Sequence, residues 1–182
     1  MKKIIMVVMV TSIAFSHAGY SQALSSNDIK AQILLDWVRA KAYTVEYLNA
    51  MPADKYSFKA NDSVRSFAQQ MIHLAQGNLL LMSMAVDLEP PTFGKSDLEH
   101  SASAATKDSV MYYVTTSYDY CIKAITATDV NKWGEVKKVF GGREVTKFAL
   151  MMKAFEHQTH HRGQTTIYIR LVGVKPPQEK LF

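Results

Sequence analysis

Four long stretches of helical periodicity limit what this chain can fold into more than any other feature. They span about residues 25–50, 61–86, 104–127 and 144–171. In each stretch apolar residues recur three or four positions apart, which places them along one face of an α-helix. A helix with one apolar face must bury that face against another element, so the pattern predicts helices packed on one another.

Residues that start or stop helices bound these stretches. Runs of N-cap formers open the first two, at Ser25-Ser26-Asn27-Asp28 and at Asn61-Asp62-Ser63. Pro90-Pro91 ends the second stretch, and Gly173 followed by Pro176-Pro177 ends the fourth. The positions expected to face the core are, stretch by stretch, Ile33, Val38, Tyr43, Tyr47 and Leu48; Phe67, Met71, Leu74, Leu81 and Met84; Val110, Tyr113, Val114, Tyr118 and Ile122; and Phe148, Met152, Phe155, Ile167 and Leu171.

The connections between the stretches differ in length and character. A polar segment without periodicity, about residues 92–103, separates the second and third stretches. Residues 129–147 break the helical pattern, and Gly141-Gly142 in their middle can turn the chain between two short strands. We expect this segment to form an ordered loop or hairpin over one end of the molecule. Four helices with one long crossover predict an all-α four-helix bundle.

The N-terminus has the layout of a secretory signal peptide. Lys2 and Lys3 precede an almost wholly apolar run, Ile4–Phe15, and small residues follow it. This run is shorter than the roughly 20 residues of a membrane span. Cleavage after Ala18 or Ala23 fits the pattern, and Ala23 is preferred because helix signals begin directly after it. The sequence therefore predicts a signal peptide at 1–23 and one domain at 24–182; the alternative is a membrane anchor or a buried first helix.

An exported chain carries further expectations. The only cysteine is Cys121, which excludes an intramolecular disulfide and leaves no cysteine at the cleavage point for a lipid anchor. Removing the signal lowers the formal charge from +5 to +3, which is too small and scattered to indicate nucleic-acid binding. We expect a periplasmic or secreted protein without a stable membrane anchor.

Two histidines in the fourth stretch lie four residues apart, at His157 and His161. On an α-helix this spacing turns through about 40°, so both imidazoles lie on one face and can bind one metal ion. His160 lies about 100° from His161 and is expected at the surface or in a supporting position. The alternative is that the pair is merely half-exposed on a polar helix face.

His73 is the candidate for a third ligand. It lies in the second stretch between Ile72 and Leu74, where a single histidine is more often a hydrogen-bonded core residue. Helix bundles, however, build metal sites from side chains on facing helices. A three-histidine set holds a metal on one side and leaves positions open for water or substrate. The predicted ligands are therefore His73, His157 and His161.

Other residues near the pair have weaker candidate roles. Glu156 and Tyr168 are candidates for proton transfer by nearness in sequence alone, and Glu156 is better interpreted as a solvated carboxylate. Arg162 is expected to pair with a carboxylate on a neighbouring helix, and Gln164 to orient an imidazole. Cys121 is expected to be an inert, buried thiol.

Several of these residues also resemble a known family. Phe67-Ala-Gln-Gln-Met-Ile-His73, Phe140-Gly-Gly, His157-Gln-Thr-His-His-Arg-Gly-Gln164 and the end of the chain from Tyr168 to Pro177 resemble the DinB-like (DinB/YfiT-like) family. The resemblance extends from about Asp28 to the end. It implies a four-helix bundle with a long crossover, often a homodimer, and a divalent metal held by three histidines, here His73, His157 and His161.

The resemblance leaves the reaction open. Relatives include thiol-dependent transferases and isomerases, but most are cytoplasmic and use intracellular thiols, whereas this chain carries an export signal. Three imidazoles suit Zn, Ni, Cu or Fe by ligand type. We therefore weigh three classes: a metal-dependent hydrolase or transferase of an unknown small molecule, a non-catalytic periplasmic metal-binding protein, and a structural or interaction module stabilised by metal.

Overall fold

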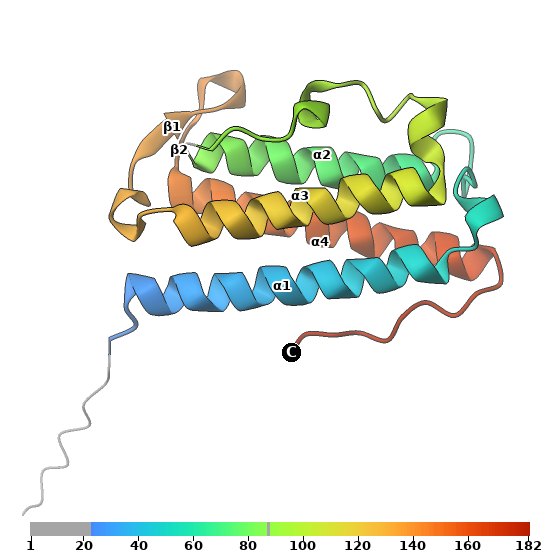
Figure 1. The fold of residues 1–182 in the computed structure, drawn as a ribbon, viewed down its shortest axis with the longest axis horizontal. Coiled ribbons are helices and arrows are strands. Elements are labelled where there is room, and N and C mark those ends of the chain that lie inside the picture. Colours follow the sequence, from blue (N-terminus) through green and yellow to red (C-terminus); the bar gives the residue numbers. More distant parts are fainter. Residues whose placement is uncertain (1–22, 87) are drawn as a thin grey trace, which may run out of the picture.

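The computed structural model describes residues 23–86 and 88–182, and its main elements are four α-helices. These are α1 (Ser26–Ala50), α2 (Phe67–Ala85), α3 (Lys107–Ala127) and α4 (Lys147–Leu171). They lie side by side as a bundle whose order around the axis is α1, α3, α2, α4 (Figure 1). The predicted all-α four-helix bundle is confirmed.

A long crossover joins α2 to α3. Both helices run in the same direction along the bundle, so the chain between them returns along its full length (Figure 1). This crossover contains two short 3₁₀ helices, η2 (Thr92–Lys95) and η3 (Ala102–Ala105). The predicted crossover is therefore confirmed, and it lies over α2, where it reaches the site described below.

The start of α2 differs from the prediction. Asn61 does not cap a helix; its side chain accepts a hydrogen bond from the Ser63 N–H at 2.7 Å and closes a turn. The helix begins after Ser66, which forms a capping box with Gln69. The Phe67 N–H also donates to the carbonyl of Phe58 at 3.0 Å, so the preceding segment helps to cap the helix. The predicted start near Asn61 is wrong because a local turn competes for the same polar residues.

A small hairpin precedes α4. Strands β1 (Val136–Lys138) and β2 (Glu144–Thr146) pair antiparallel, and Gly141 and Gly142 between them have φ of 69° and 72°. Such angles favour glycine, which explains the Gly-Gly turn. The predicted hairpin is confirmed, although β2 takes up the residues from which α4 was expected to begin. Trp133 before β1 stacks on Phe148 of α4, with ring centroids 5.3 Å apart, and covers this end of the bundle.

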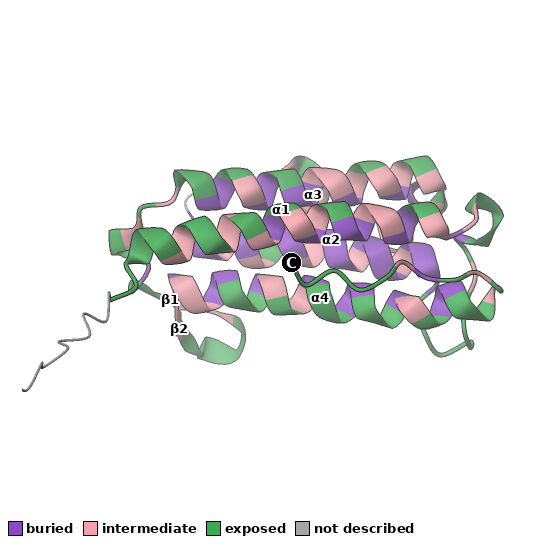
Figure 2. Ribbon diagram, turned by 90° about the horizontal axis from the view of Figure 1, so that it is seen from below, coloured by how far each residue is buried: buried purple, intermediate pink, exposed green. Residues whose placement is uncertain are grey.

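The core contains most of the predicted apolar positions, but several positions in α1 and α4 depart from the pattern. Four predicted core residues are exposed, namely Val38, Met152, Ile167 and Leu171. Figure 2 shows buried and exposed residues alternating along α4. This helix buries polar side chains instead, including Gln158 and Thr165, which are both fully buried. Apolar periodicity predicts the orientation of such a helix poorly, because the middle of its inward face is polar.

Residues 1–22, which make up nearly all of the predicted signal peptide, lie outside the described residues. Within the part of the chain that is described, no helix is both long and apolar enough to cross a membrane.

Candidate metal centre

The three predicted ligand residues meet between α2 and α4. The ring centroids of His157 and His161 are 4.3 Å apart. The ring centroid of His73 lies 5.2 Å from that of His157 and 4.6 Å from that of His161. One nitrogen from each of the three rings lies within 4.8 Å of the other two. This separation suits three imidazoles around a single ion, which binds histidine nitrogen at about 2.0–2.1 Å.

The meeting depends on a glycine in α2. Gly77 follows His73 by one helical turn, and the ring of His157 lies directly over it. A Cβ at Gly77 would lie 2.1 Å from Cε1 of His157, which no real contact permits. Gly77 therefore gives the α4 ring its place against the α2 backbone. This role was not predicted. The only signal for it in the sequence is a glycine within a segment whose other residues favour a helix.

Burial keeps two of the imidazoles neutral. It lowers the pKa of His157 to about 4 and that of His161 to about 3, with smaller contributions from the neighbouring histidines and Arg65. A metal binds only the neutral imidazole, so the site has little proton competition to overcome at these two positions.

A second observation also indicates that these three residues suit a metal ion. The Nδ1 atoms of His157 and His161 are both buried, and neither has a hydrogen-bond partner in the part of the chain that the structure describes. A buried nitrogen without a partner is costly, by about 1–3 kcal/mol. Coordination to an ion would satisfy such a nitrogen, so the three residues have the chemistry of a divalent transition-metal site.

Glu99, from the crossover, supports the third ring. Its Oε2 lies 3.0 Å from Nδ1 of His73, and its Oε1 accepts from Nε of Arg65 at 2.5 Å. A carboxylate that accepts from Nδ1 leaves the lone pair on Nε2, as in many carboxylate–histidine–metal arrangements. Glu99 was not predicted, because the crossover has no periodicity that would reveal which of its residues face the bundle.

A cleft of about 700 Å³ opens beside the histidines. His161 lines it together with Arg65, Glu99 and Tyr168, so the candidate centre lies at the wall of a space large enough for a small molecule. Gln70 on α2 also lines the cleft; it is almost fully buried, and its Oε1 has no hydrogen-bond partner among the described residues. The cleft therefore borders the candidate metal centre through His161.

Gln164 and His160 form the outer edge of this cleft. Gln164 accepts a hydrogen bond from Nε2 of Gln70, and its own Nε2 lies 3.0 Å from Nε2 of His160. His160 is exposed, as predicted, and does not belong to the group of three. Gln164 was expected to orient an imidazole, and the ring that it contacts is that of His160.

The remaining candidates are exposed, engaged in other hydrogen bonds or buried. Glu156 is exposed and pairs with Lys153 at 2.5 Å, in agreement with its interpretation as a solvated carboxylate. Tyr168 lines the cleft, but its hydroxyl donates to the carbonyl of Arg65 at 2.8 Å. Cys121 is fully buried, which raises its pKa well above the usual value, so it is an inert thiol as expected.

The expectation for Arg162 is wrong. Its guanidinium donates to Oε1 of Gln158 at 3.2 Å and lies over the ring of Tyr43, 4.6 Å from the centroid. Among the described residues, no carboxylate pairs with it. The reason is that Arg162 points toward α1, whose facing side chains are tyrosines and a threonine.

Comparisons with known proteins agree with this architecture. A model of the DinB family matches residues 22–181. An uncharacterised protein of Bacillus subtilis (strain 168), YjoA, is 23% identical over 148 residues, which cover 78% of this chain and 90% of YjoA.

Two crystal structures have a similar fold. A DinB-like protein from Bacillus cereus ATCC 10987 superimposes with a TM-score of 0.68 at 17% identity, over 82% of this chain and 97% of that chain. The structure of YjoA gives a TM-score of 0.62 at 20% identity, over 83% of this chain and 96% of that chain. At these sequence identities, the similarity to the two structures shows a shared fold and nothing more.

Proposed function

This chain belongs to the DinB family, and we propose that it is an exported divalent-metal protein that acts as a metal-dependent hydrolase or transferase on a small molecule. The observation that carries the proposal is the convergence of His73, His157 and His161, the last of which lines an open cleft. Three protein ligands on one side leave positions for water or substrate on the other.

A bound divalent ion would lower the pKa of a water to about 7 or polarise a substrate oxygen. The chain's own residues prepare the site for that chemistry. Glu99 fixes the tautomer of His73, and burial keeps His157 and His161 neutral.

The open positions can be tested by cobalt substitution. We expect azide or imidazole to change the visible spectrum of the Co-substituted protein, because small ligands enter vacant positions on the ion. A spectrum that no small ligand changes would indicate a fourth protein ligand and a closed structural site.

Turnover separates an enzyme from a binding protein. Metal-loaded and metal-free protein should be compared on chromogenic ester, amide and phosphoester substrates. Hydrolysis by the loaded form alone supports the enzyme. Tight, exchangeable metal binding without turnover of any substrate, including in transferase assays, would instead favour the non-catalytic metal-binding protein.

The proposal also includes location and assembly. The export of the protein rests on the residue pattern of positions 1–23, and the homodimer on the family resemblance. N-terminal sequencing of protein from the periplasmic fraction should find a start near Leu24, and light scattering should give twice the chain mass. An intact Met1 on membrane-bound protein would contradict export, and a single chain mass would contradict the dimer.

A further inference from the structure

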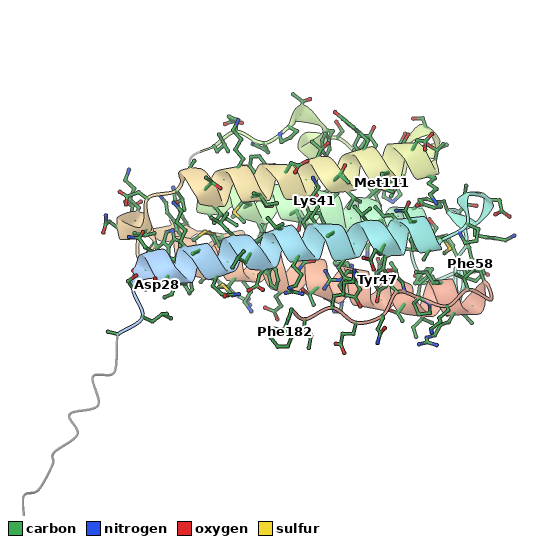
Figure 3. All side chains as sticks on the ribbon, turned by 60° about the horizontal axis from the view of Figure 1, so that its bottom comes forward. Asp28, Lys41, Tyr47, Phe58, Met111 and Phe182 are labelled. Carbon is green, nitrogen blue, oxygen red and sulfur yellow. The ribbon has the colours of Figure 1, made fainter. Side chains whose placement is uncertain are left out.

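A second cleft lies on the side of α4 that faces away from the histidines. It has a volume of about 640 Å³ and lies between α1, α4 and the C-terminal segment that follows α4. Figure 2 shows this segment running back along α4 toward α1, and in Figure 3 Tyr47 of α1 lies beside it. Near the C-terminus the segment is held at Lys180, whose carbonyl accepts a hydrogen bond from Arg39 and whose ammonium pairs with Glu46.

The floor of this second cleft contains a buried cation. Arg162 is only 7% exposed, and its two hydrogen bonds to described residues both use Nη1 as the donor, at 3.2 Å to Gln158 and at 3.5 Å to Thr44. The Gln158 oxygen is shared, because it also accepts from the hydroxyl of Tyr118 at 2.7 Å. A buried charge without a counter-ion is costly, and the Tyr43 ring under the guanidinium offsets only part of that cost.

The rest of the guanidinium fork is available to a ligand. In the described part of the chain, Nε and Nη2 of Arg162 have no acceptor, although Arg162 lines the cleft. A guanidinium presents its donors in a planar fork that matches a carboxylate or a phosphate. The missing partner of Arg162 is therefore an anion of one of these two kinds.

The residues that line the walls of this cleft also suit an organic anion in their charge and chemistry. Arg170 and Lys175 line the cleft and are exposed, and the single acidic residue among the lining residues is Glu179. Tyr43 and Tyr47 add hydroxyls 3.3 Å apart. Burial raises the pKa of Tyr43 to about 12, so its hydroxyl remains protonated and able to donate. The tyrosine rings and the prolines of the C-terminal segment supply apolar surface for an organic group.

We propose that this second cleft binds a small organic anion whose carboxylate or phosphate group pairs with Arg162, with Arg170 and Lys175 attracting it at the rim. The volume is in the range of small-molecule sites, which begin near 300 Å³. This site is separate from the histidines, since His161 faces α2 and the next residue, Arg162, faces α1. The chain thus carries two ligand sites on opposite sides of one helix.

Calorimetric titration with three probes tests the proposal: inorganic phosphate, phenyl phosphate and benzoate. We expect saturable binding of one molecule per chain, and the tighter of phenyl phosphate and benzoate identifies the preferred anion. Arg162→Lys keeps the charge but removes the fork, so it should weaken binding roughly tenfold or more. The double variant Arg170→Gln/Lys175→Gln should weaken binding several-fold while the fold, followed by circular dichroism, is retained.

Two controls make the result specific. Lys123→Gln/Arg143→Gln removes the same charge at exposed positions that do not line the second cleft, and it should leave the affinity unchanged. Binding should also persist in His161→Ala. This variant removes a candidate metal ligand, so persistent binding excludes the metal centre as the place where these anions bind. The proposal is overturned if no probe binds saturably, if the rim variant matches its control, or if His161→Ala removes binding.

Discussion

Burial sets the protonation state of single residues in this molecule, and that state is linked to stability. The pKa values of His157 and His161 in the folded chain, about 4 and about 3, lie below the ordinary value of 6.5. Below pH 6.5 the unfolded chain therefore binds protons that the folded chain does not. By linkage, the metal-free protein loses stability as the pH falls from about 6.5 toward these lower values.

This loss is measurable by thermal unfolding. Between pH 7 and pH 5, the Tm of the metal-free protein should fall by roughly 2–4 °C more than that of metal-free His161→Asn, which lacks one of the depressed imidazoles. Equal pH dependence of the two proteins would contradict the assignment of a neutral, buried His161.

Gly77 is the second residue whose effect can be isolated. Gly77→Ala should weaken metal binding at least about tenfold, since even small displacements of a ligand ring are costly. Alanine has a more favourable helix propensity than glycine by up to about 1 kcal/mol, so a loss of metal affinity in this variant would not reflect a weakened helix. Gly163→Ala in α4 is the matched control, because a Cβ there would meet no atom within 4 Å. If the two variants bind metal equally well, His157 does not need the space over Gly77.

At the scale of elements, the sequence predicts helices better than it predicts connections. The four helices follow from periodicity and caps, and the hairpin from Gly141-Gly142. The start of α2 does not, because Asn61 can serve a turn as well as a cap, and the choice depends on contacts of the preceding segment. The crossover has no periodic pattern of apolar residues, so the role of Glu99 beside His73 can be recognised only in the folded structure, where the crossover lies over α2.

The crossover element can be tested through this residue. Glu99→Ala removes the partner of His73 and should lower metal affinity roughly 10–100-fold. Asp97→Ala is its control, since Asp97 pairs at 2.7 Å with His100, which is exposed. Affinity should be titrated with a competing chelator for both variants. Equal affinities would show that the crossover does not support the centre.

Over the whole molecule, the predictable and unpredictable parts of the site have different physical origins. The spacing of His157 and His161 is a property of one helix, so it can be read from the sequence. The third ring requires α2 to lie against α4, a tertiary fact that bundle architecture and family resemblance supplied together. Gly77, Glu99 and the second cleft around Arg162 depend on which helix faces which, and no local pattern encodes that.

The central claim concerns the molecule as a metal-binding bundle, and metal analysis of the purified mature protein tests it most directly. A histidine tag must be avoided because it binds metal itself. The wild-type protein should hold about one divalent ion per chain, and His73→Ala and His161→Ala should lose it, since two imidazoles bind far more weakly than three. His160→Ala should keep the ion. Loss of the ion in His160→Ala together with its retention in His73→Ala would contradict the account.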